Sequence, residues 1–134
     1  FSFNLYAACS TDISSSDMLK FDKTKLTIDS SCASFTINFK HKGEMSAKTS
    51  GHNVVILESK NFDKVKSKID INLGEDSGYL PDMLEVIAKT EIIGGGSQTS
   101  VTMDATKLSK NAKYMFFCSF PGHYGAMKGS IEVL

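Results

Sequence analysis

The sequence predicts an all-β fold, a β-sandwich or barrel of about eight short strands with one helix lying on it. Three observations support this prediction. Apolar and polar residues alternate along several short runs, turn signals separate those runs, and a single stretch follows a helical period instead.

The expected strands carry an apolar side chain at every second position, as a strand with one face on a core requires. Phe35, Ile37 and Phe39 alternate with polar residues in this way. Further alternating pairs are Leu26 and Ile28, Val55 and Leu57, Val101 and Met103, and Ile131 and Val133. Residues 112–118 are apolar on both faces, which predicts a central strand. Turn signals lie at residues 42–43, 94–97 and 109–111.

The stretch that departs from this period covers residues 59–71. Phe62, Val65 and Ile69 fall at positions i, i+3 and i+7, with lysines between them, which predicts one amphipathic helix. We interpret the lysines as a solvated helix face, and a docking patch is the alternative.

Length and charge limit the classes of function. A chain of 134 residues fits one domain. Lysine plus arginine equals aspartate plus glutamate at 15 each, and a neutral chain without a basic stripe is unsuited to nucleic acid. No run of 18 apolar residues exists that could span a membrane.

The first seven residues are aromatic and apolar, carry no charge and lead into small residues. We interpret residues 1–7 as the remnant of a signal peptide, cleaved near Ala7 or Ala8, and residues 8–134 as a single exported, periplasmic domain. An ordinary first strand is the alternative. Lipid attachment at Cys9 is less favoured, because Tyr6 occupies the position where such signals usually carry leucine.

Three cysteines are an odd number for an exported protein. Cys9 and Cys32 lie near the start in serine-rich surroundings, whereas Cys118 lies between aromatic residues. The simplest interpretation is a Cys9–Cys32 disulfide and one free thiolate with a chemical role.

Residues 114–129 bring Cys118, His123 and Met127 into one short loop between two expected strands. A thiolate, an imidazole and a thioether suit copper in a site that must hold both Cu(I) and Cu(II). His52 would supply a second imidazole, and the Gly51 carbonyl could approach from the other side. Taken singly, these residues would be a buried thiol, a structural histidine and a core methionine. Their joint spacing favours one copper site.

This chain resembles the azurins, the bacterial blue copper proteins, over residues 7–134. The matching segments are residues 8–13, 31–32, 51–53, 89–90, 92–94, 114–118, 120–123 and 127–129. The ligand spacing is specific: four residues separate Cys118 from His123, and three separate His123 from Met127. Plastocyanin-like relatives have a shorter gap between cysteine and histidine.

The resemblance implies a Greek-key, cupredoxin-like fold and one type 1 copper at His52, Cys118 and His123, with Met127 and the Gly51 carbonyl axial. It also implies the Cys9–Cys32 disulfide. Three residues are expected to support the ligands: Asn53 by hydrogen bonds near the thiolate, and Phe120 and Pro121 in the loop. His41 matches a histidine that can titrate with redox state, and a partly buried structural histidine is the alternative.

The resemblance further implies electron exchange through an apolar patch around the exposed edge of His123. Ser50 and Ala126 are small where azurins carry larger apolar residues, and Val54 replaces a core tryptophan of some azurins. These differences leave the choice of partner open. We expect c-type cytochromes or copper or haem reductases as partners.

Two other classes of function compete with a single-electron carrier. A copper storage or delivery protein usually has a labile, methionine-rich site. A copper enzyme normally needs a second copper centre, which three histidines in total cannot supply. A hydrolase would leave Met127 unexplained. Zinc could occupy the same ligands. We predict a carrier and no enzyme.

Overall fold

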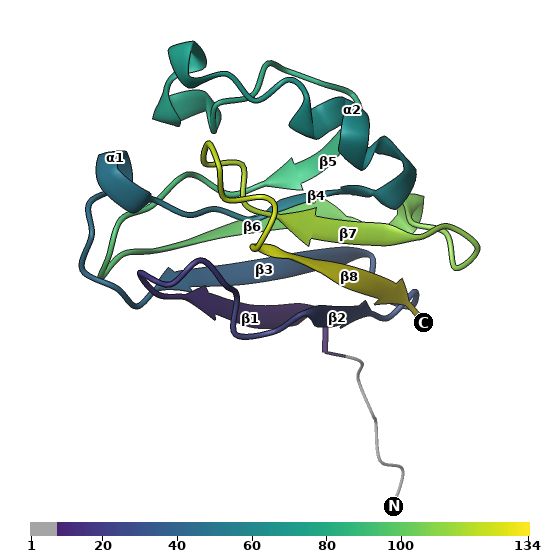
Figure 1. Cartoon of the computed structure of the whole chain (residues 1–134). Helices are drawn as coiled ribbons and strands as arrows, with labels where there is room; N and C mark the ends of the chain where they lie inside the picture. The colour runs from purple at the N-terminus through teal and green to yellow at the C-terminus, as the bar shows by residue number, and fades with distance from the viewer. Residues whose placement is uncertain (1–7) are drawn as a thin grey trace, which may run out of the picture.

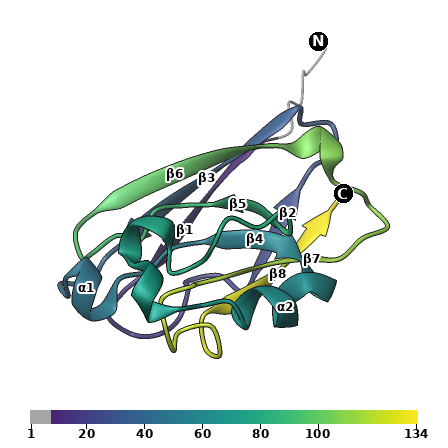
Figure 2. The same cartoon turned by 90° about the horizontal axis from the view of Figure 1, so that it is seen from above.

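Two β-sheets pack face to face in the computed structural model, which describes residues 8–134 (Figures 1 and 2). The first sheet has the order β1-β3-β6, and the second has the order β2-β8-β7-β4-β5. The strands are β1 (Ser10–Ser15), β2 (Lys25–Ile28), β3 (Ser34–His41), β4 (Val55–Glu58), β5 (Val86–Lys89), β6 (Gln98–Asp104), β7 (Tyr114–Phe117) and β8 (Lys128–Val133). β1 runs parallel to β3 and β2 parallel to β8, while the other neighbours are antiparallel. The predicted Greek-key β-sandwich is confirmed.

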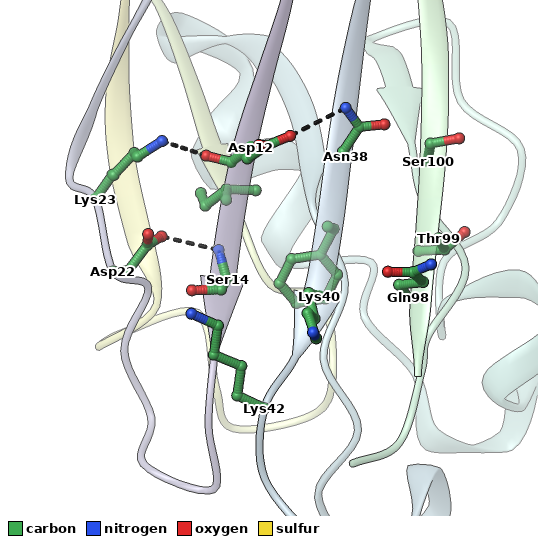
Figure 3. A pocket seen from close by; sticks show the side chains of 12 residues that line it. Asp12, Ser14, Asp22, Lys23, Asn38, Lys40, Lys42, Gln98, Thr99 and Ser100 are labelled. Atoms are coloured by element: carbon green, nitrogen blue, oxygen red, sulfur yellow. Dashed lines mark hydrogen bonds between the residues drawn. The ribbon is translucent and has the colours of Figure 1, made fainter. Parts of the chain in front are cut away.

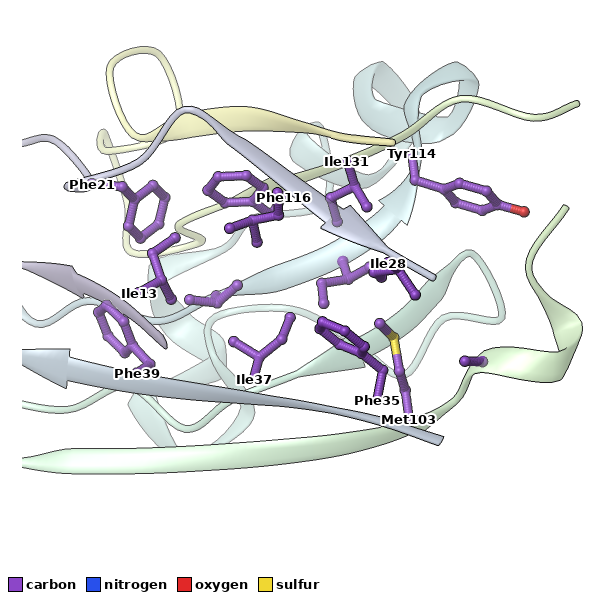
Figure 4. Close-up of a cluster of buried hydrophobic side chains, with 14 of the residues drawn as sticks. Ile13, Phe21, Ile28, Phe35, Ile37, Phe39, Met103, Tyr114, Phe116 and Ile131 are labelled. Atoms are coloured by element: carbon purple, nitrogen blue, oxygen red, sulfur yellow. The ribbon is translucent and has the colours of Figure 1, made fainter. Parts of the chain in front are cut away.

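The space between the sheets is filled by the apolar side chains that alternate in the sequence (Figure 4). Phe35, Ile37 and Phe39 of β3 are each at most 1% exposed and point toward the second sheet. From the other sheet, Phe116 and Ile131 face them. The two-residue period therefore places one face of each strand in a common core.

The second sheet is buried on both faces. Val54 and Ile56 belong to the core between the sheets, whereas Val55 and Leu57 belong to a second cluster with Phe117 on the outer face. All four residues of β7 are buried, and β7 lies between β8 and β4. The continuous apolar run of this segment therefore does predict a central strand.

Short helices join the strands. They are α1 (Ala47–Ser50), α2 (Phe62–Lys66) and the 3-10 turns η1 (Ser59–Asn61), η2 (Ile71–Leu73), η3 (Glu75–Ser77) and η4 (Ala105–Lys107). The predicted helix over residues 59–71 is shorter than expected. The N–H groups of Lys68 and Ile69 bond to the carbonyls of Val65 and Lys66, so tight three-residue turns end α2. Val65 is buried, as the helical period of the apolar residues predicts.

The start of the described chain is attached to the first sheet by a disulfide. Cys9 and Cys32 are bonded, as predicted, with their Cα atoms 5.6 Å apart. This bond uses the Cys9 sulfur, which lipid attachment would require. The proposed signal remnant, residues 1–7, lies outside the described residues. Within residues 8–134, no helix is long and apolar enough to cross a membrane.

The fold brings several loops to one end of the sandwich. The loop between β7 and β8 lies between α1 and α2 in both views (Figures 1 and 2). The buried row of β3 continues from Phe39 to His41, so a histidine completes the core at this end.

Candidate metal centre

Three candidate ligands converge at this end of the molecule. His52 Nδ1 lies 3.2 Å from His123 Nδ1, and Cys118 Sγ lies 3.9 Å and 3.7 Å from these two nitrogens. His52 and Cys118 are fully buried, and His123 is 7% exposed. Among residues 8–134, this is the one group of three histidine, cysteine or acidic side chains that could hold a metal ion.

The spacing of the three atoms fits one small metal ion. Zinc, an ion of similar size to copper, takes nitrogen ligands at about 2.0 Å and sulfur at about 2.3 Å. In a trigonal arrangement these lengths separate the donors by roughly 3.5 Å between nitrogens and 3.7 Å between nitrogen and sulfur. The observed separations are close to both values. The two-imidazole, one-thiolate set is the one found in blue copper sites.

His52 reaches the site because helix α1 ends at Ser50 and one residue, Gly51, turns the chain toward it. Ser46 caps the helix by accepting a hydrogen bond from the Thr49 N–H, and the Gly51 N–H closes the last turn on Ala47. A side chain on Gly51 would overlap the Ala47 carbonyl and Ile92. The backbone of His52 then pairs with Ile93 in an isolated bridge. Position 51, between helix α1 and the His52–Ile93 bridge, therefore requires glycine.

The loop after β7 is a series of tight turns that return to Cys118. The His123 N–H donates to the Phe120 carbonyl at 3.0 Å, and the Met127 N–H donates to the His123 carbonyl at 2.9 Å. Pro121 and Gly122 occupy the turn centre, and Gly122 has a φ of +86°, which a type II turn requires. The Cys118 N–H donates to the Met127 carbonyl and closes the loop. The loop length thus sets the distance between thiol and imidazole.

The tautomer of His52 is fixed by a carbonyl that the sequence did not reveal. His52 Nε2 lies 2.7 Å from the Ser16 carbonyl oxygen, which can only accept a hydrogen bond. Nε2 therefore carries the proton, and Nδ1 presents its lone pair to Cys118 and His123. No sequence signal marks Ser16, because its main chain makes the contact.

Asp17 holds the loop that carries this carbonyl. Its carboxylate accepts hydrogen bonds from the Glu44 N–H at 2.9 Å and the Met45 N–H at 3.1 Å. These two bonds are the main cause of a lowered pKa at Asp17. Sequence reasoning missed this residue because its partners lie 27 and 28 positions away.

Asn53 joins the two segments that carry His52 and Cys118. Its side-chain oxygen accepts from the Ser119 N–H at 2.8 Å, and its amide nitrogen donates to Ser119 Oγ at 2.9 Å. Ser119 Oγ in turn donates to the Gly78 carbonyl. Backbone N–H groups of Asn53 and Phe120 also bond to Cys118 Sγ. These bonds favour a sulfur anion.

Without a metal, burial keeps all three candidate ligands uncharged. Desolvation raises the pKa of Cys118 to about 12, against the two backbone bonds that lower it. Desolvation and the neighbouring His52 lower the pKa of His123 to about 4. Desolvation also lowers the pKa of His52. A cation that displaces the thiol proton would therefore restore the charge that burial suppresses.

Aromatic rings pack against His123. Phe117, next to Cys118 in the chain, is fully buried but belongs to the outer apolar cluster, whereas Cys118 belongs to the core between the sheets. Phe120 stacks on the His123 ring with a centroid distance of 4.4 Å, and Tyr79 contacts the edge of Phe120 at 5.4 Å. Only a small edge of His123 reaches solvent. The rings therefore exclude water from the His123 side of the site.

Met127 is fully buried at the end of the same loop, and Gly51 directly precedes His52. Gly51 is thus adjacent to one ligand in the chain, and Met127 lies four residues after another, His123. Axial roles for the Met127 thioether and the Gly51 carbonyl remain predictions.

His41 is fully buried and stacks on His52, with ring centroids 4.5 Å apart. The Gly43 N–H donates to His41 Nδ1 at 3.0 Å, so Nε2 carries the proton and donates to the Ser50 carbonyl at 3.1 Å. Both ring nitrogens are thus used within the protein. A link between His41 titration and redox state remains a prediction.

A separate groove lies over β1, β3 and β6 (Figure 3). Asn38 donates to the Asp12 side chain, Lys23 donates to the Asp12 carbonyl, and the Ser14 N–H donates to Asp22. Its acidic groups are therefore already paired with protein groups.

Comparison with known proteins agrees with this geometry. Residues 7–134 match the family model described as copper binding proteins, plastocyanin/azurin family. The chain is 41% identical to an azurin of Pseudomonas aeruginosa over 130 residues, which cover 96% of this chain and 87% of that protein. It is 43% identical to an azurin of Pseudomonas chlororaphis over 126 residues, which cover 93% and 98%.

A solved structure shows the same fold. An azurin, Az-iso2, from Methylomonas sp. strain J superposes with a TM-score of 0.89 at 38% identity, covering 96% of this chain and 99% of that one. With His52, Cys118 and His123 arranged as a single type 1 copper site requires, the chain belongs to the plastocyanin/azurin family of copper-binding proteins.

Proposed function

We propose that this protein is a periplasmic blue copper protein that passes single electrons between redox partners and transforms no substrate. The observation that carries the proposal is the convergence of His52 Nδ1, Cys118 Sγ and His123 Nδ1 within 4.8 Å of one another in a buried position. Copper bound there would supply the Cu(I)/Cu(II) couple.

The roles of the individual residues follow from their contacts. His52, Cys118 and His123 would hold the ion, while Met127 and the Gly51 carbonyl would approach along the axis. The hydrogen bonds between Asn53 and Ser119 fix the backbone beside Cys118, and the backbone N–H groups near the sulfur favour its thiolate form. Phe120 and Pro121 shape the loop around His123.

Rigid support matters because an electron carrier must change its ligand geometry little between oxidation states. The Ser16 carbonyl, the turns of the 118–127 loop and the stacked rings place the donors before any ion binds. Such a site avoids a large rearrangement on electron transfer.

Electrons would enter and leave through the edge of His123, with partners such as c-type cytochromes or copper or haem reductases docking around it. The loops at this end carry the exposed apolar side chains Met18, Leu19 and Met45. Ser16 and Asp17 tie these loops to the site. Exposed apolar groups near a redox centre suit brief, weakly polar contacts with a partner.

An oxidising compartment is supported by the Cys9–Cys32 disulfide, since such bonds persist in the periplasm and are rare in the cytosol. The competing role in copper storage or delivery would need a site that releases its ion readily. The candidate ligands are instead buried, which favours a retained ion.

The visible spectrum tests the proposal. Adding Cu(II) to the metal-free protein should produce an intense blue band, because the thiolate can donate charge to the ion. Copper-treated Cys118→Ser should lack this band, since an oxygen ligand cannot supply the charge-transfer transition of the thiolate. A colourless copper-loaded wild-type protein would contradict the proposal, and rapid transfer of copper to a chelator would favour delivery.

A further inference from the structure

The Phe62 side chain of helix α2 contacts the neighbours of two candidate ligands. Its ring meets Phe117 edge-on, with centroids 5.2 Å apart and planes at 71°. It also meets Tyr124 edge-on at 6.1 Å and 74°. Phe117 directly precedes Cys118, and Tyr124 directly follows His123. One side chain of helix α2 therefore contacts the chain neighbours of both ligands, at the end of β7 and within the loop.

Two lysines hold the Phe62 ring from the solvent side. Lys66 Nζ lies 5.0 Å from the Phe62 ring centroid and 5.4 Å from that of Tyr124, while Lys128 Nζ lies 5.4 Å from Phe62. Lys66 is itself paired with Asp63 at 3.1 Å. Cations over aromatic faces are attracted to the ring electrons, so both lysines help to hold the half-buried ring in place.

Tyr124 is the loop residue that faces helix α2. The loop's internal turns bond His123 to Phe120 and Met127 to His123, and Phe120 contacts Tyr79 on another side. Tyr124 packs with Phe62 against the outer apolar cluster that contains Phe117 and Val65. The Phe62–Tyr124 contact, together with Lys66 over the Tyr124 ring, thus joins the loop to helix α2 beside it (Figures 1 and 2).

We infer that Phe62 and Tyr124 are positioning residues, which brace the ligand loop against helix α2 and hold His123 at its distance from Cys118. Edge-to-face pairs of this kind add stability beyond their buried area. Losing the brace would free the His123 side of the loop, while strand β7, which ends directly before Cys118, stays paired with β4 and β8.

The inference rests on the proposed function only for the identity of the ligands, and its test needs no copper. Amide hydrogen exchange of the metal-free protein reports how often a local hydrogen bond opens. The His123 and Met127 N–H groups, both bonded within the loop, are the reporters. Backbone N–H groups of β3 are the reference, because this strand lies in the other sheet.

Phe62→Leu should accelerate exchange at His123 and Met127 by about tenfold, the effect expected for losing two aromatic pairs, with β3 unchanged. Tyr124→Leu should accelerate exchange at the same two amides by a smaller factor, because it removes one of the two pairs. Phe62→Tyr, which keeps the ring, should retain wild-type exchange. Phe35→Leu is the matched control, because it removes a core ring from β3. In this variant, exchange at the His123 and Met127 amides should not accelerate more than exchange at the β3 amides.

Copper loading gives a second readout. Copper-loaded Phe62→Leu should keep its blue band, which shows that the ligands are intact, but exchange electrons between oxidised and reduced protein several-fold more slowly. Wild-type exchange at both loop amides in Phe62→Leu and Tyr124→Leu, or an equal acceleration in β3, would overturn the inference. A colourless wild-type protein would instead contradict the proposed function alone.

Discussion

Asn53 shows how much one buried side chain can contribute when all its polar atoms are used. It is fully buried and makes hydrogen bonds to Ser119 and to the Thr90 carbonyl. Removing it would leave the Ser119 N–H without this partner inside the protein.

We therefore expect Asn53→Ala to lower the free energy of unfolding by about 2–4 kcal/mol, because each lost or unsatisfied buried hydrogen bond costs about 1–2 kcal/mol. Urea denaturation of the metal-free protein measures this change. Asn38→Ala is the control: Asn38 is exposed, and within residues 8–134 its side chain donates to Asp12, so its loss should change stability little. Equal effects of the two substitutions would contradict the role given to Asn53.

Met127 offers a test of the axial assignment. Leucine has nearly the same volume as methionine, so Met127→Leu should preserve the buried packing. The blue band should persist, because Cys118 is unchanged. The reduction potential should rise, because a weak donor to Cu(II) is lost.

Voltammetry of the copper-loaded protein measures this rise. Met103→Leu is the control, since Met103 is also buried but lies on β6, against Phe35. A potential that stays unchanged in Met127→Leu, or that moves equally in Met103→Leu, would show that the thioether is not a ligand.

The disulfide and the metal loop are separate elements, one at the start of the first sheet and one after β7. Cys9 and Cys32 are 23 residues apart, a separation at which a cross-link adds roughly 3–3.5 kcal/mol by restricting the unfolded chain. The bond should therefore affect stability without affecting the site.

The double variant Cys9→Ser/Cys32→Ser should lower the free energy of unfolding by about 3 kcal/mol and keep the blue spectrum. Chemical denaturation and absorption of the same copper-loaded sample measure both quantities. Loss of the blue band in the folded variant would show that the disulfide also supports the ligands.

Helix α2 and helix α1 show why some elements were predicted less well than others. Phe62 and Val65 have the helical spacing that revealed α2, but its end depends on backbone turns at Lys68 and Ile69 that carry no strong sequence signal. Helix α1 is one turn long and lacks an apolar period. Its function, placing His52, depends on a packing contact between Gly51 and Ile92.

The buried, uncharged ligand cluster should give the metal-free protein a pH window of maximum stability. His123 has a pKa of about 4 in the folded protein, below its ordinary value of 6.5, so the unfolded chain binds its proton first as the pH falls. Stability should then decrease from about pH 6.5 downward. His52 acts in the same direction.

Cys118 limits the window on the alkaline side. Its pKa of about 12 lies above the ordinary value of 9.0, so the unfolded chain loses the thiol proton first and stability should decrease above about pH 9. Thermal unfolding between pH 5 and 11 measures both limits. Metal-free Cys118→Ser should lack much of the alkaline decrease. An unchanged alkaline decrease in this variant would assign it to other groups, such as Tyr79, whose pKa burial also raises.

The sequence by itself determined the strand periodicity, the disulfide pair, and the ligands that lie within one short loop. Cys118, His123 and Met127 are close in the chain, so their spacing carries the chemistry without knowledge of the fold. The contacts from Ser16, Asp17 and Phe62 were decided only by the tertiary structure. Each joins segments distant in the chain, through a main-chain carbonyl, a loop carboxylate or a ring edge, and such contacts leave no local pattern.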